Sequence, residues 1–157
     1  MADVVSKAKR SEMMAGIRSK DTKPEMIIRR GLHARGYRFR LHRKDLPGKP
    51  DIILPRYRVA IFVNGCFWHG HDCHLFKSPK TREAFWREKI CGNIVRDRAK
   101  IEALKSAGWR VGVIWECLIR REGVESSIDA LTLFLEHDGD TETHWPHGVR
   151  IACNLAN

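Results

Sequence analysis

The side chains of this sequence that are best suited to chemistry form a dense group of cysteines and histidines. Most of them fall between residues 66 and 74, and one follows a predicted strand later in the chain; they are Cys66, His69, His71, Cys73, His74 and Cys117. Thiolates and imidazoles are the ligands that zinc prefers. The four-ligand set that we consider first is Cys66, His71, Cys73 and Cys117.

A closed set of this kind favours a structural zinc over a catalytic one, because it leaves no open coordination position. His69 would then be free for another role. Spacing alone does not choose among the three histidines of the group. Buried cysteines and surface histidines without any metal are the alternative.

A carboxylate at the head of a predicted strand is the second feature. Asp51 follows Pro50, and an apolar strand comes about ten residues later. This arrangement resembles the hairpin of PD-(D/E)xK nucleases, whose carboxylates hold Mg²⁺ against the scissile phosphate. The acidic-x-Lys element is absent, because the corresponding strand end is Phe62-Val63-Asn64. A metal ligand there must be a backbone carbonyl, which Mg²⁺ tolerates because it keeps waters and needs few protein oxygens.

A base is needed in place of the missing lysine, and His69 is the nearest candidate. A neutral imidazole near its usual pKa can take a proton from water. Asp97, midway along a basic helix, could orient it, and Glu25 could reach a metal-bound water from the first turn of its own helix. The alternatives are ordinary: Asp97 pairs with Arg96 and Arg98, His69 is a zinc ligand, and Glu25 only caps its helix.

Two large aromatic side chains, Phe67 and Trp68, lie in a loop of small and polar residues. They must pack inward or enter a partner, and Trp86 and Met14 are similar. Apolar wedges between base pairs cost about a few kcal/mol of unstacking per step and open a distorted site. Core packing is the alternative, and it suits the tryptophans of residues 109–115 better.

The formal charge of the 157-residue chain is +10, and it is unevenly distributed. Residues 1–50 hold 14 basic and 5 acidic side chains, whereas residues 111–157 hold 3 and 8. Clustered cations release counterions from phosphates, so nucleic acid is the first candidate partner and a merely cationic surface is the alternative.

Neither a membrane span nor a secretion signal is visible. No run approaches the roughly 18 apolar residues of a span, and the first residues lack an apolar core. We therefore expect a cytosolic protein, whose five cysteines are thiols or metal ligands rather than disulfides.

The hydrophobic pattern predicts one mixed α/β domain with the element order α-β-β-β-α-β-α. Helices are predicted at residues 22–36, 81–108 and 124–135, and strands at 37–41, 51–54, 59–63 and 109–115, the middle two forming a hairpin. We expect a basic arm at residues 1–20, the domain at 21–136, and a tail without an assigned element or role at 137–157. The arm would order on a partner; an ordinary flexible terminus is the alternative.

Several segments together closely resemble the very-short-patch repair (Vsr) endonucleases. They are LPGKPD at 46–51, NGCFWHGHDC at 64–73, FWREKI at 85–90, Asn93, RDR at 96–98, GWRV at 108–111 and WEC at 115–117. The resemblance runs from about Lys7 to about Leu135, in order and at matching spacing. It implies a restriction-endonuclease-like fold, a PD-(D/E)xK variant with one structural zinc. It also implies a bacterial Mg²⁺-dependent nickase that cuts 5′ to the thymine of a T:G mismatch, the product of 5-methylcytosine deamination.

The resemblance further implies a role for each matched position of the site. Asp51 and the carbonyl of Val63 hold Mg²⁺. His69 activates the attacking water with Asp97 behind it, and Glu25 supports waters on the metal. The zinc ligands are Cys66, His71, Cys73 and Cys117.

The matched positions outside the metal sites contact DNA. The wedges beside the mismatch are Met14, Phe67, Trp68 and Trp86. Lys89 and Asn93 contact the recognition sequence, and the basic arm closes over the minor groove. The implied partners are duplex DNA with a T:G mismatch, mismatch-repair proteins and a repair polymerase, and the protein is expected to act as a monomer in the bacterial cytoplasm, at the nucleoid.

One position departs from the family. Asn64 stands where the family has a histidine that touches the scissile phosphate, and asparagine can donate a hydrogen bond but no positive charge. This leaves two rival functions: a restriction nuclease that cleaves both strands of matched DNA, and a zinc-stabilised DNA-binding module without catalysis. The aromatic pair in the loop argues against the first, and a decayed site at Asn64 would favour the second.

Overall fold

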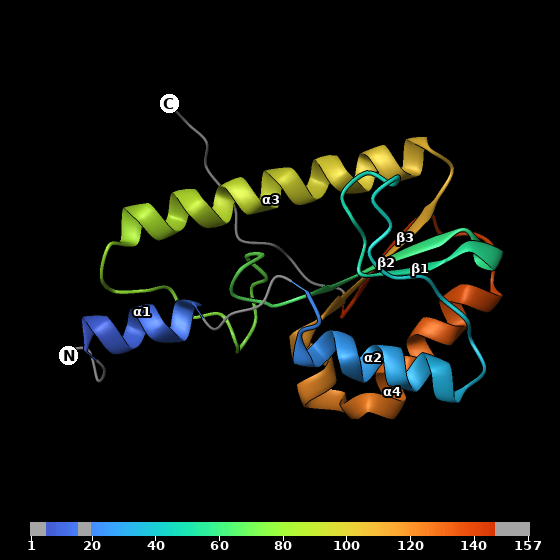
Figure 1. Ribbon diagram of the computed structural model, residues 1–157, viewed down its shortest axis with the longest axis horizontal. Helices are drawn as coiled ribbons and strands as arrows, with labels where there is room; N and C mark the ends of the chain where they lie inside the picture. The colour runs from blue at the N-terminus through green and yellow to red at the C-terminus, as the bar shows by residue number, and fades with distance from the viewer. Residues whose placement is uncertain (1–5, 16–19, 147–157) are drawn as a thin grey trace.

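The computed structural model describes residues 6–15 and 20–146, which form a four-stranded mixed sheet with helices on both faces (Figure 1). The strand order is β1-β2-β3-β4. Helices α2 (Lys23–Ala34) and α4 (Glu116–Glu136) cover one face, and the long α3 (Glu83–Ser106) covers the other. The prediction of a mixed α/β fold is confirmed.

The predicted hairpin is confirmed as well. β1 (Ile52–Leu54) and β2 (Val59–Asn64) pair antiparallel, and the short helix η1 (Pro55–Tyr57) joins them. Arg58 completes the turn with a left-handed φ of 51°. Every residue of β2 except Phe62 is buried, as expected of a central strand.

The strand predicted at 37–41 is wrong. Within the described residues only Arg40 forms a bridge, to Ile53. The reason is that β1 offers just three residues, and His42, with a φ of 50°, turns the chain away.

The second parallel strand fixes where the functional loops meet. β3 (Arg110–Trp115) lies parallel to β2, and both end together, with Asn64 opposite Trp115. A parallel pair needs a crossover, which α3 supplies. Because the loop after β2 and the start of α4 leave the same end of the sheet, residues 65–75 come close to Cys117.

Two helix starts differ from prediction. α3 begins at Glu83 with Arg82 as its N-cap, at a φ of 53° and without a side-chain capping bond, so Thr81 is not the cap. α4 begins directly after β3, earlier than predicted, but Gly123, at φ 85°, is non-helical and divides it, and the part that follows matches the helix predicted at 124–135. The Thr22 cap of α2 is confirmed, since its hydroxyl accepts from the Glu25 amide.

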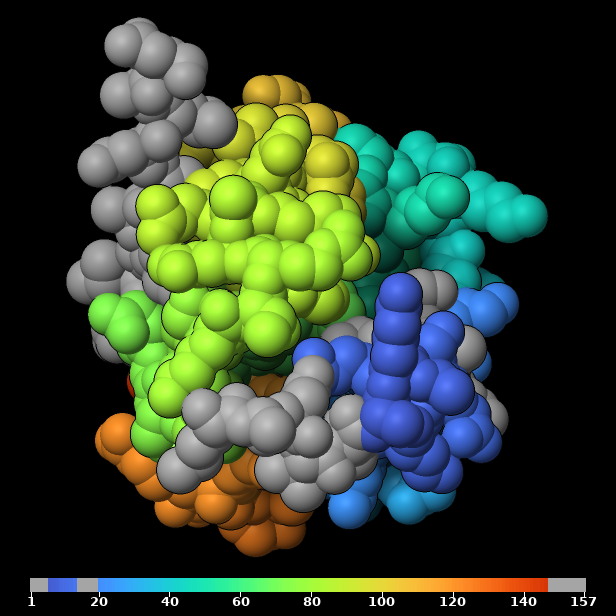
Figure 2. Space-filling model, turned by 90° about the vertical axis from the view of Figure 1, so that its left-hand side faces the viewer, coloured from blue at the N-terminus to red at the C-terminus, as the bar shows by residue number. Residues whose placement is uncertain are grey.

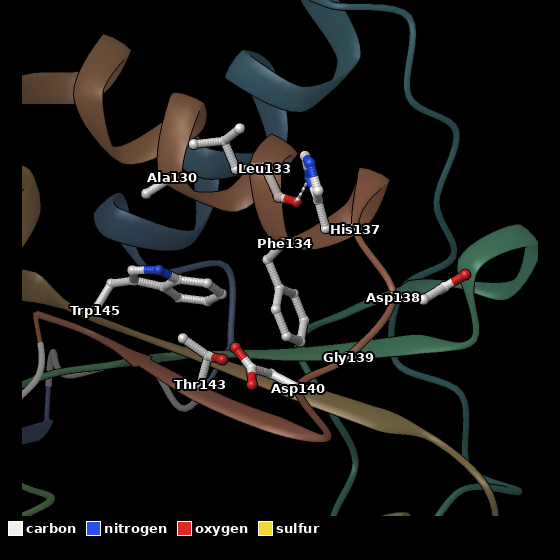
Figure 3. A pocket seen from close by; sticks show the side chains of 9 residues that line it. All are labelled: Ala130, Leu133, Phe134, His137, Asp138, Gly139, Asp140, Thr143 and Trp145. Atoms are coloured by element: carbon white, nitrogen blue, oxygen red, sulfur yellow. Dashed lines mark hydrogen bonds between the residues drawn. The ribbon is translucent and has the colours of Figure 1, made fainter.

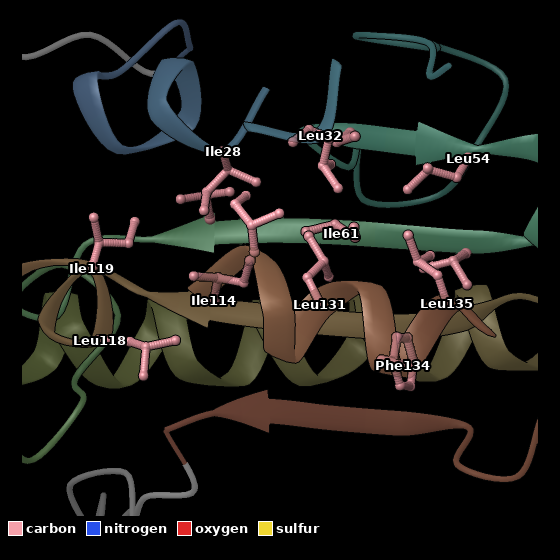
Figure 4. Close-up of a cluster of buried hydrophobic side chains, with 14 residues drawn as sticks. Ile28, Leu32, Leu54, Ile61, Ile114, Leu118, Ile119, Leu131, Phe134 and Leu135 are labelled. Carbon is pink, nitrogen blue, oxygen red and sulfur yellow. The ribbon is translucent and has the colours of Figure 1, made fainter. Parts of the chain in front are cut away.

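The main core lies between the sheet and helices α2 and α4 (Figure 4). Leu32, Ile61 and Leu131 are completely buried there, and each such side chain contributes about 1.5–3 kcal/mol. Gly31 lets α2 approach α4 closely, because a Cβ at this position would lie 2.6 Å from the side chain of Ile128.

The predicted basic arm contains a helix, α1 (Lys7–Ala15). Local contacts support it: the Ser6 hydroxyl accepts from the Lys9 amide, and Lys9 pairs with Glu12. Its Met13 is 58% exposed, in line with an element that has little apolar surface to bury. No helix within residues 6–15 and 20–146 is both long and apolar enough to cross a membrane.

A fourth strand lies in the segment to which no element was assigned. β4 (Glu142–Trp145) pairs parallel to β3 at the sheet edge, with Trp145 opposite Ile114. The Trp145 ring packs edge-on against Phe134 at 5.2 Å. Gly112 makes room for it, since a Cβ there would lie 2.9 Å from the ring.

The connection between α4 and β4 is acidic and lies at the end of the sheet opposite the loop that begins at Gly65, because β2, β3 and β4 run parallel. Asp138 and Asp140 line a pocket of about 580 Å³ there, together with apolar side chains of α4 (Figure 3). Neither carboxylate has an ion pair with any residue in 6–15 or 20–146.

Candidate active site and metal centre

A pair of carboxyl groups lies between α2 and the β1–β2 hairpin. The Asp51 amide donates to the Ile61 carbonyl at 3.0 Å, and the Asp51 Oδ2 accepts from the Val63 amide at 2.8 Å. Asp51 and Val63 are therefore direct neighbours. Glu25, which is 2% exposed, is the neighbouring carboxyl group on α2 that acts on Asp51.

Burial is the main cause that raises the pKa of Asp51 to about 7; the Val63 amide opposes this shift and the Glu25 carboxyl adds to it. Two neighbouring carboxyl groups, one buried and the other partly buried, repel each other as anions. A divalent cation would favour both ionised forms, so the oxygen atoms present fit a hard cation such as Mg²⁺.

Three residues that sequence reasoning missed hold Glu25 in place. Arg29 donates to Glu25 Oε2 at 2.8 Å and to Asp21 Oδ1 at 2.7 Å. His42 Nε2 lies 3.3 Å from the Arg29 guanidinium. The spacing of Glu25 and Arg29, one helical turn apart, is the only local signal that could have found this group.

The predicted imidazole and its orienting carboxylate are in contact. His69 Nδ1 lies 2.7 Å from Asp97 Oδ2, which joins the loop after β2 to the middle of α3. A carboxylate only accepts, so Nδ1 carries the hydrogen, which leaves Nε2 as the nitrogen that has a lone pair in the neutral imidazole. The His69 side chain is 29% exposed, so Nε2 can reach a solvent molecule or a substrate.

The four cysteine and histidine ligands considered first lie together. The ligand atoms of Cys66, His71, Cys73 and Cys117 all lie within 4.8 Å of one another. His71 is buried and stacks on Trp115 at 4.5 Å. His69 and His74 are not part of this cluster.

The donor set of this cluster fits a metal ion. Burial raises the pKa of the Cys66 and Cys117 thiols; Cys73 adds to both shifts, whereas the hydrogen bond with Cys66 lowers the pKa of Cys117. A bound metal ion would remove this penalty, because it deprotonates a coordinating thiol. Cys91 differs from the expectation for cysteines in this chain, since it is disulfide-bonded; Cys153 lies outside the described residues.

The predicted wedge residues form one aromatic cluster. Phe67 lies 5.1 Å from Trp68 and 5.6 Å from Trp86, measured between ring centres. The Lys89 ammonium is 5.5 Å from the rings of Trp68 and Trp86. Sequence reasoning missed Phe76, which stacks on Phe67 at 5.9 Å. The N-terminal part of α3, which carries Trp86 and Lys89, faces the viewer in Figure 2.

The remaining predicted site residues have simple positions. Asn93 donates to the Trp68 carbonyl at 2.8 Å and thereby ties the wedge loop to α3. Asn64 is buried at the last position of β2. Trp109 and Trp115 are both buried, which agrees with the alternative that these tryptophans pack in the core. Met14 belongs to α1, and its side chain lies outside the part of the chain that the structure describes.

The paired carboxyl groups and the histidine held by Asp97 fit an enzyme of the nuclease class, and the relatives of this chain belong to that class. The family described as DNA mismatch endonuclease Vsr matches residues 2–75. The chain is 52% identical over 117 residues to the type II nicking enzyme V.XorIIP of Xanthomonas oryzae pv. oryzae, covering 74% of this chain and 86% of that protein. It is 48% identical over 137 residues to the DNA mismatch endonuclease Vsr of Escherichia coli, covering 87% of this chain and 86% of that one. The chain belongs to the Vsr family of DNA mismatch endonucleases.

Proposed function

We propose that this enzyme nicks duplex DNA 5′ to the thymine of a T:G mismatch, with Mg²⁺ at Asp51 and Val63 and a structural zinc. The observation that carries the proposal is the position of His69. It follows the aromatic pair directly in the chain, and Asp97 holds it at 2.7 Å. The base and the two wedges thus belong to one loop, which begins directly after the strand that carries Val63 and Asn64.

Asp51 and the Val63 carbonyl would hold Mg²⁺, with Glu25 binding its waters. When bound, Mg²⁺ neutralises charge on the phosphoryl oxygens as the bond to the leaving oxygen breaks. The Asp51 carboxylate is oriented for this by the Val63 amide, so it needs no rearrangement. Glu25 approaches from α2 and completes an oxygen-rich site.

His69 would take the proton of the attacking water at Nε2. Asp97 holds the opposite nitrogen, fixes the tautomer and stabilises the imidazolium that forms. Asn64, at the end of β2, would donate a hydrogen bond to the scissile phosphate. Because asparagine carries no charge, the cation must supply most of the charge stabilisation there.

Replacement of His69 by glutamine is expected to lower the single-turnover nicking rate about 100- to 10,000-fold, the range that general base catalysis contributes. Glutamine can still bond to Asp97, so the loop keeps its position. His74→Gln is the matched control, because this exposed imidazole lies outside both sites, and it should cut at the normal rate. Normal cutting by His69→Gln would rule out this base.

The aromatic cluster would select the mismatch by entering the base stack. Phe67 and Trp68 are half-buried, so they can leave their neighbours at low cost, and Lys89 brings a cation to the same surface. A mispaired step costs less to unstack than a matched one, which is one source of selectivity. Met14, Trp86 and Asn93 belong to the same proposed interface, over which the arm at 1–20 would close.

Trp68→Ala is expected to raise the Kd for a T:G duplex about 5- to 150-fold, because stacking on one base contributes about 1–3 kcal/mol. Fluorescence anisotropy measures this directly, with a matched duplex as reference. Leu133→Ala removes a side chain that is 62% exposed near the sheet edge formed by β4, and it should leave the Kd unchanged. Equal affinities of Trp68→Ala and wild type would contradict the wedge.

The remaining parts of the proposal concern the whole protein. Zinc would hold the loop after β2 to α4 and take no part in the chemistry. We propose an arm at 1–20 and a catalytic domain at 21–136, with the 137–157 segment extending its sheet through β4. The enzyme would act as a monomer in the bacterial cytoplasm, at the nucleoid, and hand its nick to mismatch-repair proteins and a repair polymerase.

The test of the function is a nicking assay on end-labelled duplexes that carry each mismatch in several sequence contexts. The expected product is one nick, on the thymine strand and 5′ to the mismatched base, only with a divalent cation. Cleavage of both strands of matched DNA would instead identify a restriction nuclease. Tight mismatch binding without product in Mg²⁺ or Mn²⁺ would identify a module without catalysis.

A further inference from the structure

A buried arginine that no step above uses lies beside the carboxyl pair. The Arg29 side chain is 8% exposed and binds Glu25 and Asp21 through its two terminal nitrogens. Its Nε forms no hydrogen bond within the described residues. A buried ion pair with an unused donor is a poor source of stability, and an apolar side chain of similar volume commonly serves as well or better. The position of Arg29 therefore needs another explanation.

The surroundings of Arg29 are themselves fixed. His42 Nε2 lies 3.3 Å from the guanidinium and 3.4 Å from Asp21 Oδ1. Asp21 and His42 have φ values of 54° and 50°, in the left-handed region that residues other than glycine rarely adopt. Such conformations persist only where the surroundings determine them. Two segments, the start of α2 with Asp21 and the turn at His42, thus enclose one guanidinium.

The guanidinium determines how Glu25 is presented. Both Arg29 and the Asp21 amide donate to Oε2 of Glu25, at 2.8 and 3.0 Å, so Oε1 receives neither bond. The other polar neighbour of Glu25 is Asp51. Two carboxylates in contact repel each other, and a fixed cation behind one of them offsets this repulsion.

We propose that Arg29 is a positioning residue for strand cleavage. Anchored by Asp21 and His42, it holds the Glu25 carboxylate beside Asp51, where Glu25 binds waters of the divalent cation. This inference rests on the proposed function. In this role Arg29 does not touch DNA, but it sets the Mg²⁺ concentration that cleavage requires.

The test compares Arg29→Met with wild type in single-turnover nicking of a T:G duplex across a series of Mg²⁺ concentrations. Loss of a residue that orients a metal site costs about 10- to 100-fold. We expect that loss in rate, a higher Mg²⁺ requirement, and an unchanged Kd for the duplex. Arg29→Lys should recover part of the rate, because lysine keeps the charge but loses the bidentate geometry.

Arg30→Met is the matched control, because Arg30 is the next residue of α2 and is exposed, and it should behave as wild type. If thermal melting shows that Arg29→Met does not fold, Arg29→Lys and Asp21→Asn give the same test with smaller shifts. A wild-type rate and Mg²⁺ dependence in these variants, or a loss confined to the duplex Kd, overturns the proposal. Failure of the wild-type protein to nick contradicts the proposed function itself.

Discussion

Replacement of Asp51 by asparagine is expected to lower the nicking rate about 1,000-fold or more. A bound cation supplies several kcal/mol of transition-state stabilisation, and roughly 4 kcal/mol corresponds to a factor of about 1,000. Asparagine keeps an oxygen that can accept the Val63 amide, so the hairpin survives while the anionic ligand is lost. Single-turnover nicking and calorimetric titration of Mg²⁺ measure the two consequences.

The control for this substitution is Asp138→Asn, because Asp138 is an exposed carboxylate at the opposite end of the sheet. It should nick at the wild-type rate. If Asp51→Asn cuts as fast as this control, the cation site has been assigned to the wrong residue. A normal melting temperature of Asp51→Asn separates lost chemistry from lost folding.

Replacement of Cys117 by serine is expected to reduce bound zinc from about one equivalent to near zero and to remove most of the soluble protein. The cluster joins the loop after β2 to the start of α4. Structural zinc contributes an apparent binding free energy of about 10–16 kcal/mol in zinc-finger peptides, which exceeds the stability of an ordinary domain. Atomic absorption and a soluble-fraction assay measure the two effects.

Cys91→Ser is the matched control, since it changes a buried cysteine of α3 outside the metal cluster. Under reducing conditions it should keep one equivalent of zinc. A wild-type preparation that is folded and free of metal would refute the zinc site. Full zinc content in Cys117→Ser would show that the ligand set is different.

The elements that could be predicted are those with their own local pattern. The apolar run at 59–63 and the turn at 55–57 define a hairpin without reference to the rest of the chain, and the structure confirms it. β4 could not be predicted, because its four half-buried residues become a strand only through pairing with β3 and packing of Trp145 on Phe134. The 37–41 pattern failed for the opposite reason, since the short β1 gives it almost no partner.

The candidate site likewise has a part that the sequence predicts and a part that it does not. The density of cysteines and histidines pointed to a metal cluster, and the shared end of β2 and β3 explains why Cys117 joins it. The group around Arg29 was missed, because its members come from two loops with left-handed residues and one helix. No short-range sequence pattern predicts that these residues come together around Arg29. The roles of Asp51, His69 and Glu25 in cleavage remain predictions for the experiments above.

The acidic connection between α4 and β4 places negative charge at the end of the sheet away from the aromatic cluster. Its carboxylates lie at one end of the sheet, and the lysine and arginine side chains around Trp86 lie beyond the other. We expect the phosphates of a duplex to repel these carboxylates and to attract these cations, so that the aromatic loop turns towards the DNA before contact. Productive collisions are therefore over-represented, and their advantage fades as salt screens the field.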